Sequence, residues 1–242
     1  MTERSSLSLV LAGPLQSWGT SSRFATRSTS LEPSKSGVLG LLAAAQGRPR
    51  TADIQDLVAL RFGVRVDQPG SLVRDFQTER RTEAVRGGSK VVSLPLSHRY
   101  YLADAVFVVA VEGPANLIGD LAAAIRSPRF PLYLGRRACP PAGPLIPEVH
   151  RETLEVVLES FPYSASDRRA ARQALDVRLP VVRDPLPGER ASSSEQDVPI
   201  SYDPAHRRYA KRDTIRTEVV VRNVRGRASM DSHDPMSAVI GS

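Results

Sequence analysis

Short apolar runs in the first third of the chain predict two strands with two helices between them. Residues 6–11 alternate and then become apolar, which predicts a strand that ends at a Gly-Pro turn. After a polar, Ser/Thr-rich connection, residues 34–47 place apolar positions at helical spacing between a serine cap and a glycine stop. Residues 51–60 predict a second short helix, which leads into a strand at residues 62–66.

The middle of the chain joins its most polar segment to its most apolar one. Residues 73–100 surround a Gly-Gly turn with few apolar positions, which predicts a hairpin-like excursion too polar to hold a core of its own. Residues 103–111 form a nearly continuous apolar run, which is typical of a central strand covered on both faces. Pro114 is tolerated in a first helical turn, and the apolar spacing after it predicts a helix.

The last third of the chain is more irregular. Six prolines between residues 128 and 147 exclude a helix in that stretch. Strands are predicted at residues 154–158, 181–182 and 215–224, and a loop of low hydrophobicity is predicted at residues 185–200.

The order of elements is strand, helix, strand, polar hairpin, strand, helix, strand. This order predicts an α+β protein with a ferredoxin-like body and an inserted basic β-hairpin arm. We assign residues 1–145 to the body and residues 73–101 to the arm. Residues 146–224 are expected to form a smaller, mostly β part packed on the body, and residues 225–242 a flexible tail. Many RNA-binding modules have a body of this kind.

The composition is that of an ordinary globular domain, because 41% of the 242 residues are hydrophobic and 24% are charged. It excludes a wholly disordered, collagen-like or disulfide-stapled chain. No apolar run is long enough for a membrane-spanning helix and no secretion signal is present, so we expect no membrane contact. The single cysteine, Cys139, cannot form an internal disulfide, and we therefore expect a cytoplasmic protein.

The charge balance points to an anionic partner. Lys and Arg number 33 against 26 Asp and Glu, a formal net charge of +7, and only three of the 33 are Lys. A genome rich in G and C explains the preference for Arg over Lys, but it does not require a positive net charge. A basic domain of this size favours a nucleic acid, because the planar guanidinium suits phosphates and stacks on bases. A solvated basic surface without a ligand is the alternative.

The sequence offers little for metal or hydrolase chemistry. One cysteine and four widely spaced histidines give no ligand pair at the spacing of a metal site, and no Gly-x-Ser-x-Gly elbow occurs. The Gly-Gly-Ser-Lys run at residues 87–90 lacks the glycine spacing of a phosphate loop and predicts a turn. We expect neither a metal nor another cofactor.

Metal-free RNA cleavage is the best catalytic hypothesis, since it needs only a general acid and base near a 2′-hydroxyl. Two groups supply suitable residues: His98 with Tyr100 and Tyr101, and His206 with Tyr209 and Lys211. The alternative is that both groups belong to a basic, aromatic binding face. We favour binding over cleavage, because no acid–base pairing follows from the sequence.

Four segments have the residues of ligand-contact loops: residues 11–19, the helix opening at residues 34–37, residues 133–137, and the arm. The helix opening favours a phosphate because its backbone N–H groups are free. Trp18 could stack a base or be a core residue, and residues 133–137 could equally form a solvated turn. The candidate RNA-binding residues are Gln16, Trp18, Arg27, Lys35, Ser36, Tyr133, Gly135, Arg136 and Arg137. The arm carries Arg74, Arg80, Arg81, Arg86, Lys90 and Arg99.

Several of these motifs occur together in one family. They are LAGPLQSWG (11–19), TR (26–27), SKSGVLGLL (34–42), VRDFQT (73–78), RYYLADAVF (99–107) and PRFPLYLGRRACP (128–140). In this order and spacing, residues 7–145 resemble the CasD family of subunits of the type I-E CRISPR surveillance complex, Cascade. The family belongs to the RAMP superfamily of CRISPR-associated proteins.

The resemblance implies a ferredoxin-like RAMP body with a thumb, which coincides with the arm. It implies a non-catalytic, RNA-binding subunit in antiviral defence that caps the 5′ handle of the CRISPR RNA. Such subunits dock against the large PAM-reading subunit, CasA, and the backbone subunit, CasC, so target DNA is met only indirectly. Type I-E systems leave guide processing to CasE, whereas related subunits of type I-C systems cleave the precursor. A metal-free endoribonuclease is therefore the alternative.

The resemblance also suggests roles for the candidate residues. Arg27, Lys35, Arg136 and Arg137 would neutralise handle phosphates. Gln16, Trp18 and Tyr133 would contact or support exposed bases, as in other complexes with single-stranded RNA. The arm would wedge across the guide where handle meets spacer and fix the register of the next subunit.

Overall fold

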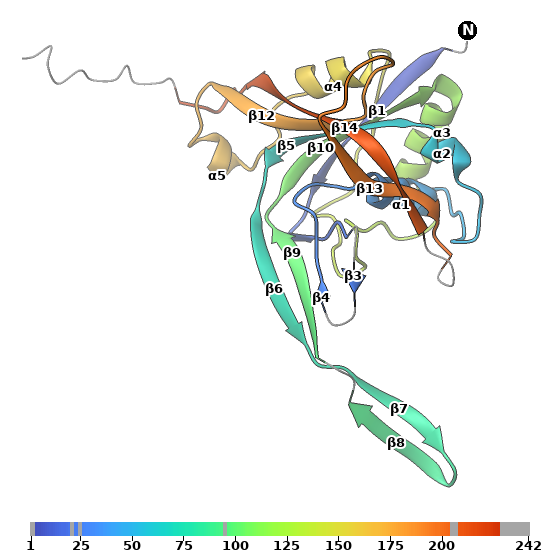
Figure 1. Cartoon of the computed structure of the whole chain (residues 1–242). Helices are drawn as coiled ribbons and strands as arrows, with labels where there is room; N and C mark the ends of the chain where they lie inside the picture. Colours follow the sequence, from blue (N-terminus) through green and yellow to red (C-terminus); the bar gives the residue numbers. More distant parts are fainter. Residues whose placement is uncertain (1–2, 20–21, 24–25, 94–95, 204–207, 228–242) are drawn as a thin grey trace, which may run out of the picture.

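A seven-stranded antiparallel sheet forms the centre of the molecule (Figure 1). The computed structural model describes residues 3–19, 22–23, 26–93, 96–203 and 208–227. In spatial order, the strands are β11 (Glu148–His150), β1 (Arg4–Ala12), β10 (Val106–Pro114), β5 (Arg61–Gln68), β12 (Asp176–Arg183), β14 (Arg208–Arg222) and β13 (Ser193–Ser201). The prediction of a mixed α/β protein is confirmed, and antiparallel sheets dominate it.

Strand β10 is central and is covered on both faces, as its apolar run predicts. One face, with Phe107 and Val109, packs in the main core together with helices α1 (Lys35–Ala45) and α3 (Ala115–Arg126). The other face, with Val108 and Ala110, packs against α4 (Leu154–Ser160). Each face of the strand therefore belongs to a separate hydrophobic cluster.

The helices of the first half lie where their capping signals predict them. Helix α1 begins after Ser34, whose side chain accepts a hydrogen bond from the backbone N–H of Gly37. The short α2 (Gln55–Val58) follows, and Pro114 is the residue that precedes the first turn of α3. No helix in the described part of the chain is long and apolar enough to span a membrane.

Two predictions in the C-terminal half are wrong. Residues 154–158, predicted as a strand, form the first turns of α4 and bury Leu154, Val157 and Leu158 at helical spacing. A short apolar run does not distinguish these two structures. The loop predicted at residues 185–200 includes most of β13, which is polar because it is an edge strand that pairs only with β14.

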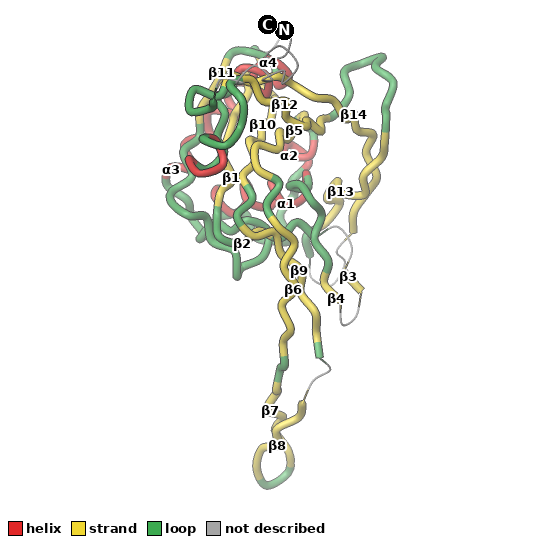
Figure 2. The backbone as a smooth tube through the Cα atoms, turned by 90° about the vertical axis from the view of Figure 1, so that its left-hand side faces the viewer, coloured by secondary structure: helices red, strands yellow, loops and turns green. Residues whose placement is uncertain are grey.

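A second sheet carries the segment predicted as the arm. Its strands are β2 (Leu15–Gln16), β9 (Ser97–Ala103), β4 (Thr26–Arg27), β3 (Ser22–Arg23) and β6 (Ser71–Gln77). Strands β6 and β9 run outward as a pair, and β7 (Arg80–Val85) and β8 (Gly88–Ser93) form a separate hairpin beyond them. Both Figure 1 and Figure 2 show this arm extending well away from the body.

The C-terminal strands continue the central sheet. Strand β12 pairs with β5 on one side and with β14 on the other, and the short α5 (Asp167–Ala170) lies just before it in the chain. Of the tail predicted to be flexible, Arg227 donates a backbone hydrogen bond to Gln173. Residues 228–242 lie outside the described residues.

Candidate nucleic-acid interface

The loop at residues 133–137 is bound to the segment that follows β1. The backbone N–H of Ser17 donates to the carbonyl of Leu134 at 3.1 Å. Gly135 has φ +88°, and a Cβ there would lie 1.8 Å from the carbonyl oxygen of Ser17. Only glycine fits, because both the conformation and the contact exclude a side chain. The backbone that packs closely against Gly135 is therefore that of Ser17 in the same protein, and not that of a ligand. Tyr133 is half-buried in the same loop.

Gln16 and Trp18 are core residues. Trp18 is 1% exposed, and its Nε1 donates to Oε1 of Gln16 at 3.1 Å. The Gln16 amide in turn donates to the carbonyls of Leu11 and Ala105. A Cβ on Gly37 of α1 would lie 2.7 Å from the Trp18 ring. Direct base contact by Gln16 and Trp18 is therefore wrong for this structure, because neither side chain reaches the surface; both support the loops around them.

The start of α1, expected to hold a phosphate, already holds a carboxylate. The backbone N–H of Lys35 donates to Oδ2 of Asp197 at 2.7 Å, and its Nζ lies 2.9 Å from Oδ2 of Asp184. Strand β13 brings Asp197 to the helix, where the dipole favours an anion. Lys35 and Ser36 are both buried. The prediction that they bind RNA phosphates is therefore wrong, because the protein itself supplies the anion.

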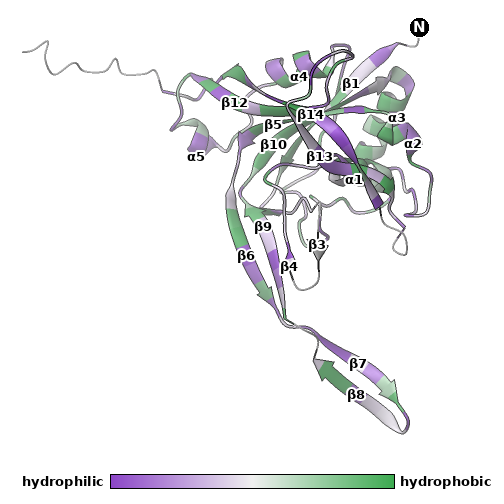
Figure 3. Cartoon of the chain, viewed as in Figure 1, coloured by the Kyte–Doolittle hydropathy of each residue, from purple (hydrophilic) through white to green (hydrophobic). Residues whose placement is uncertain are grey.

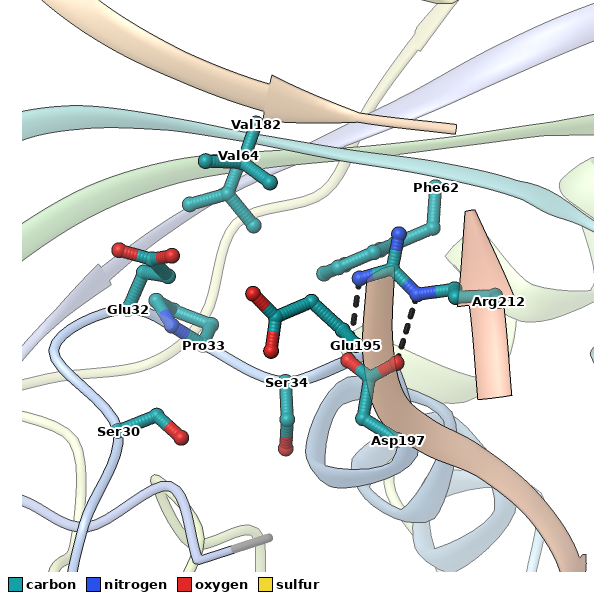
Figure 4. A pocket seen from close by; sticks show the side chains of 10 residues that line it. All are labelled: Ser30, Glu32, Pro33, Ser34, Phe62, Val64, Val182, Glu195, Asp197 and Arg212. Carbon is teal, nitrogen blue, oxygen red and sulfur yellow. Dashed lines mark hydrogen bonds and ion pairs between the residues drawn. The ribbon is translucent and has the colours of Figure 1, made fainter. Parts of the chain in front are cut away.

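Arg212 completes this ionic cluster. Figure 4 shows its guanidinium, which donates to both carboxylate oxygens of Asp197 and lies over the Phe62 ring. The guanidinium also donates to Oδ1 of Asp184. Burial lowers the pKa of Arg212, but hydrogen bonds and charges of the two aspartates outweigh it, so its pKa is raised. Sequence reasoning missed Asp184, Asp197 and Arg212, since no local pattern links residues so far apart in the chain.

Arg136 and Arg137 have different roles although they are neighbours. Arg136 donates to the carbonyls of Arg27, Ser28 and Tyr100 at 2.8, 3.1 and 3.0 Å. It also lies over the Tyr101 ring, 5.0 Å from its centroid. Arg136 therefore ties residues 27–28 to the base of the arm. The side chains of Arg27 and Arg137 are exposed, and they remain the cations of this region that could reach a phosphate.

The arm presents cations along its whole length. Five of its six predicted cations are exposed: Arg74, Arg80, Arg81, Arg86 and Lys90. Arg99 is half-buried, and Arg81 is ion-paired with Glu83 in the same strand. Exposed apolar side chains lie between these charges, among them Phe76 at 54% exposure and Val91 at 59%. Figure 3 shows hydrophobic and hydrophilic residues interspersed along the arm. The arm therefore has little core, and a mixed basic and apolar surface.

The structure separates two members of the first candidate catalytic group, His98 and Tyr101. The His98 ring packs against the Phe76 ring at an angle of 50°, with 5.4 Å between the centroids, and its Nδ1 has no hydrogen-bond partner within the described ranges. Tyr101 is buried on the opposite face of β9. His206 lies outside the described residues. Among the described residues, no group of three or more His, Cys, Asp or Glu could hold a metal.

Comparison with known proteins identifies the family. The model of the CRISPR-associated protein (Cas_Cas5) family matches residues 6–215. The CRISPR system Cascade subunit CasD of Escherichia coli strain K12 is 37% identical over 156 residues, which cover 59% of this chain and 70% of that protein. A chain of a solved CRISPR RNA-guided surveillance complex superimposes with a TM-score of 0.71 at 32% identity, covering 93% of this chain and 95% of its own.

A second solved structure, the crystal structure of a Cas protein, gives a TM-score of 0.68 at 36% identity and covers 92% of this chain and 98% of its own. The match to the family model, over residues 6–215, includes the central sheet from β1 into β14. The chain therefore belongs to the CRISPR-associated protein (Cas_Cas5) family.

Proposed function

We propose that the chain is a non-catalytic, RNA-binding subunit of a type I-E Cascade complex, and that it holds the 5′ handle of the CRISPR RNA in antiviral defence. Membership of the Cas_Cas5 family supports the Cascade role, as does the similarity to the E. coli subunit CasD and to a chain of an RNA-guided surveillance complex.

The observation that carries the proposal is the exposed basic arm. Arg74 is solvent-exposed on β6, and Arg86 and Lys90 are solvent-exposed on the β7–β8 hairpin, which buries no side chain of its own. Long basic side chains on a projecting strand pair fit the phosphates of a flexible single strand, and exposed Phe76 can stack on a base. Arg27 and Arg137 extend this basic surface to the body.

The strand order supports a ferredoxin-like body. Strands β1, β5, β10 and β11, with α1 after β1 and α3 after β10, follow the β-α-β-β-α-β order of that fold. In this assignment the arm, inserted between β5 and β10, is the thumb. The C-terminal strands β12, β14 and β13 form the smaller part that packs on the body through β5.

The partners in this proposal are the CasC backbone subunit and the large subunit CasA, with target DNA reached through them. Exposed apolar side chains on the arm favour a contact with protein as well as RNA, since Leu72, at 57% exposure, shares a face of β6 with Phe76 and Arg74 lies between them. Interfaces between subunits commonly combine such apolar residues with Arg.

The test is to incubate the full chain with end-labelled repeat RNA in EDTA and to score cleavage and nuclease footprint together. We expect intact RNA with protection confined to the 5′ handle, and an unrelated RNA of equal length should bind more weakly. Cleaved RNA would contradict the non-catalytic role, and protection elsewhere would contradict handle binding.

Metal-free endoribonuclease activity is the second candidate. The observation that favours it is the half-buried His98 ring, whose shielded Nδ1 has no hydrogen-bond partner among the described residues and so is not held by a structural hydrogen bond. If cleavage occurs, it should be lost in His98→Ala and retained in Tyr101→Phe, because the Tyr101 ring is buried. RNA that stays intact with the unaltered chain removes this candidate.

A further inference from the structure

A groove at the base of the arm lies outside the surfaces described above. Its volume is about 700 Å³, which is within the range of about 300–1,000 Å³ typical of ligand sites. One wall is the turn between β9 and β10 with the Gly13-Pro14 turn, and the other is the segment at residues 166–173 that contains α5. Figure 1 shows α5 on the side of the body where β5 leads into β6.

Gln68, at the end of β5, holds the two walls together. Its Nε2 donates to the carbonyl of Asp104, and its Oε1 accepts from the hydroxyl of Ser166 at 2.9 Å. Asp104 has φ +55° and donates its backbone N–H to the carbonyl of Pro14. The groove is therefore built from tied segments of both halves of the chain.

Three arginines line this groove: Arg168, Arg169 and Arg172. Arg168 and Arg172 are exposed, and none of the three is ion-paired within the part of the chain that the structure describes. The nearby carboxylate of Asp167 is already paired with Arg225. Nε of Arg169 is shielded from solvent and has no hydrogen-bond partner among the described residues. Asp104 is the one carboxylate among the described lining residues, so the groove is net positive.

This chemistry selects a phosphate-bearing chain. Guanidinium groups bind phosphate oxygens through paired hydrogen bonds, and Gln173 and Ser166 add polar groups that can bond to a ribose. Pro14 and Val106 give the groove an apolar lining that a base or sugar can contact. A duplex presents its phosphates on a wide convex surface, whereas a single strand is thin enough to enter a concave site.

We propose that this groove binds the sugar–phosphate backbone of single-stranded RNA, as a second site beside the arm. The site rests on the proposed RNA-binding function and extends it to the C-terminal part of the chain. The turn at Asp104 leads directly from β9 of the arm, so a strand that leaves the arm base reaches the groove without crossing the body. Arg168 and Arg172 bind phosphates of this RNA strand, and Arg169 binds the phosphate that lies deepest in the groove.

The test measures binding of the full chain to fluorescein-labelled handle RNA at several salt concentrations. In Arg168→Glu/Arg172→Glu, we expect affinity to fall about tenfold. The salt slope, which is the slope of the logarithm of the binding constant against the logarithm of the salt concentration, should become shallower by about 1.4. This is about 0.7 for each of two phosphate contacts with a single strand. RNA containing 4-thiouridine should crosslink to residues 166–173 in the unaltered chain and not in the variant.

Two further variants separate this inference from the proposed function. Arg50→Glu/Arg190→Glu changes two exposed arginines that do not line the groove, and it should bind like the unaltered chain. Arg137→Glu reports on the arm base alone. If Arg137→Glu weakens binding but the groove variant keeps full affinity, slope and crosslinks, the groove site is overturned and the proposed function stands. If the unaltered chain does not bind the RNA, the proposed function itself fails.

Discussion

The start of α1 and the arm are both rich in cations, but they use them in opposite ways. The side chains of Lys35 and Arg212 are only 7% and 10% exposed, and each is matched by an aspartate from a distant strand or loop. On the arm, Arg74, Arg86 and Lys90 are exposed and unmatched by carboxylates among the described residues. The first set joins segments of the fold, and the second is available for a ligand.

The difference shows that positive charge alone does not identify a binding residue. A buried cation has lost its hydration, so it persists only with fixed counter-charges that also exclude a ligand. An exposed cation keeps its water and gives up little of it when it meets a phosphate. Burial and partners, rather than residue type, therefore separate structural from functional arginines in this chain.

The largest effect is expected when one partner is removed from the buried cluster. Asp184→Ala leaves Lys35 and Arg212 partly uncompensated, and it also removes the acceptor of the Phe62 N–H. We expect the free energy of unfolding to fall by about 3–5 kcal/mol, measured by urea denaturation. RNA affinity of the folded protein should not change.

Asp176→Ala is the matched control, because the ion pair of Asp176 with Arg222 is exposed on both sides. In this variant the free energy of unfolding should fall by less than about 1 kcal/mol. Equal losses in the two variants would show that burial does not distinguish the cluster from a surface pair.

The second effect is expected at the arm. Replacing residues 80–93 by a short Gly-Ser turn removes four cations and one carboxylate but no buried side chain. We expect handle RNA affinity to fall about tenfold or more and the salt slope by about 2, with little change in stability, because surface changes rarely exceed about 0.5 kcal/mol. Unchanged affinity with normal folding would contradict the thumb assignment.

The sequence predicted those parts of the fold that depend on local pattern. The apolar run of β10 and the serine cap of α1 lie where expected, and Pro114, expected in the first turn of α3, directly precedes that helix. The helix α4 was missed because residues 154–158 satisfy a strand and a helix equally, and only packing against β10 decides between them. The polar β13 was missed because edge strands need few apolar residues.

The candidate site was less predictable because its residues depend on long-range partners. The capping serine correctly placed the start of α1, but Asp197 lies 162 residues beyond Lys35 and fills the anion site. Gln16 and Trp18 satisfy each other's polar groups in the core, which no local motif indicates. The arginines at residues 168–172 belong to a segment that is acidic on average, so charge counting did not reveal the groove.

The smallest effects are expected at the neighbouring residues Arg136 and Arg137, which test whether the first is structural and the second binds RNA. Arg136→Ala removes hydrogen bonds to three backbone carbonyls and should lower the free energy of unfolding by about 2 kcal/mol. Arg137→Glu changes an exposed side chain, so stability should stay within about 0.5 kcal/mol while the salt slope of RNA binding falls by about 0.7. Urea denaturation and fluorescence anisotropy measure the two effects on the same samples.

If Arg136→Ala instead weakened RNA binding without loss of stability, and Arg137→Glu left RNA binding unchanged, Arg136 would be the residue that binds RNA and Arg137 would not. Arg136→Lys sharpens the test, because lysine keeps the charge but cannot bond the carbonyls of Arg27, Ser28 and Tyr100 with one planar group. If Arg136 acts only by tying residues 27–28 to the arm base, lysine restores little stability. If its charge matters for RNA, lysine restores most of the affinity, and the division between buried and exposed arginines fails at this position.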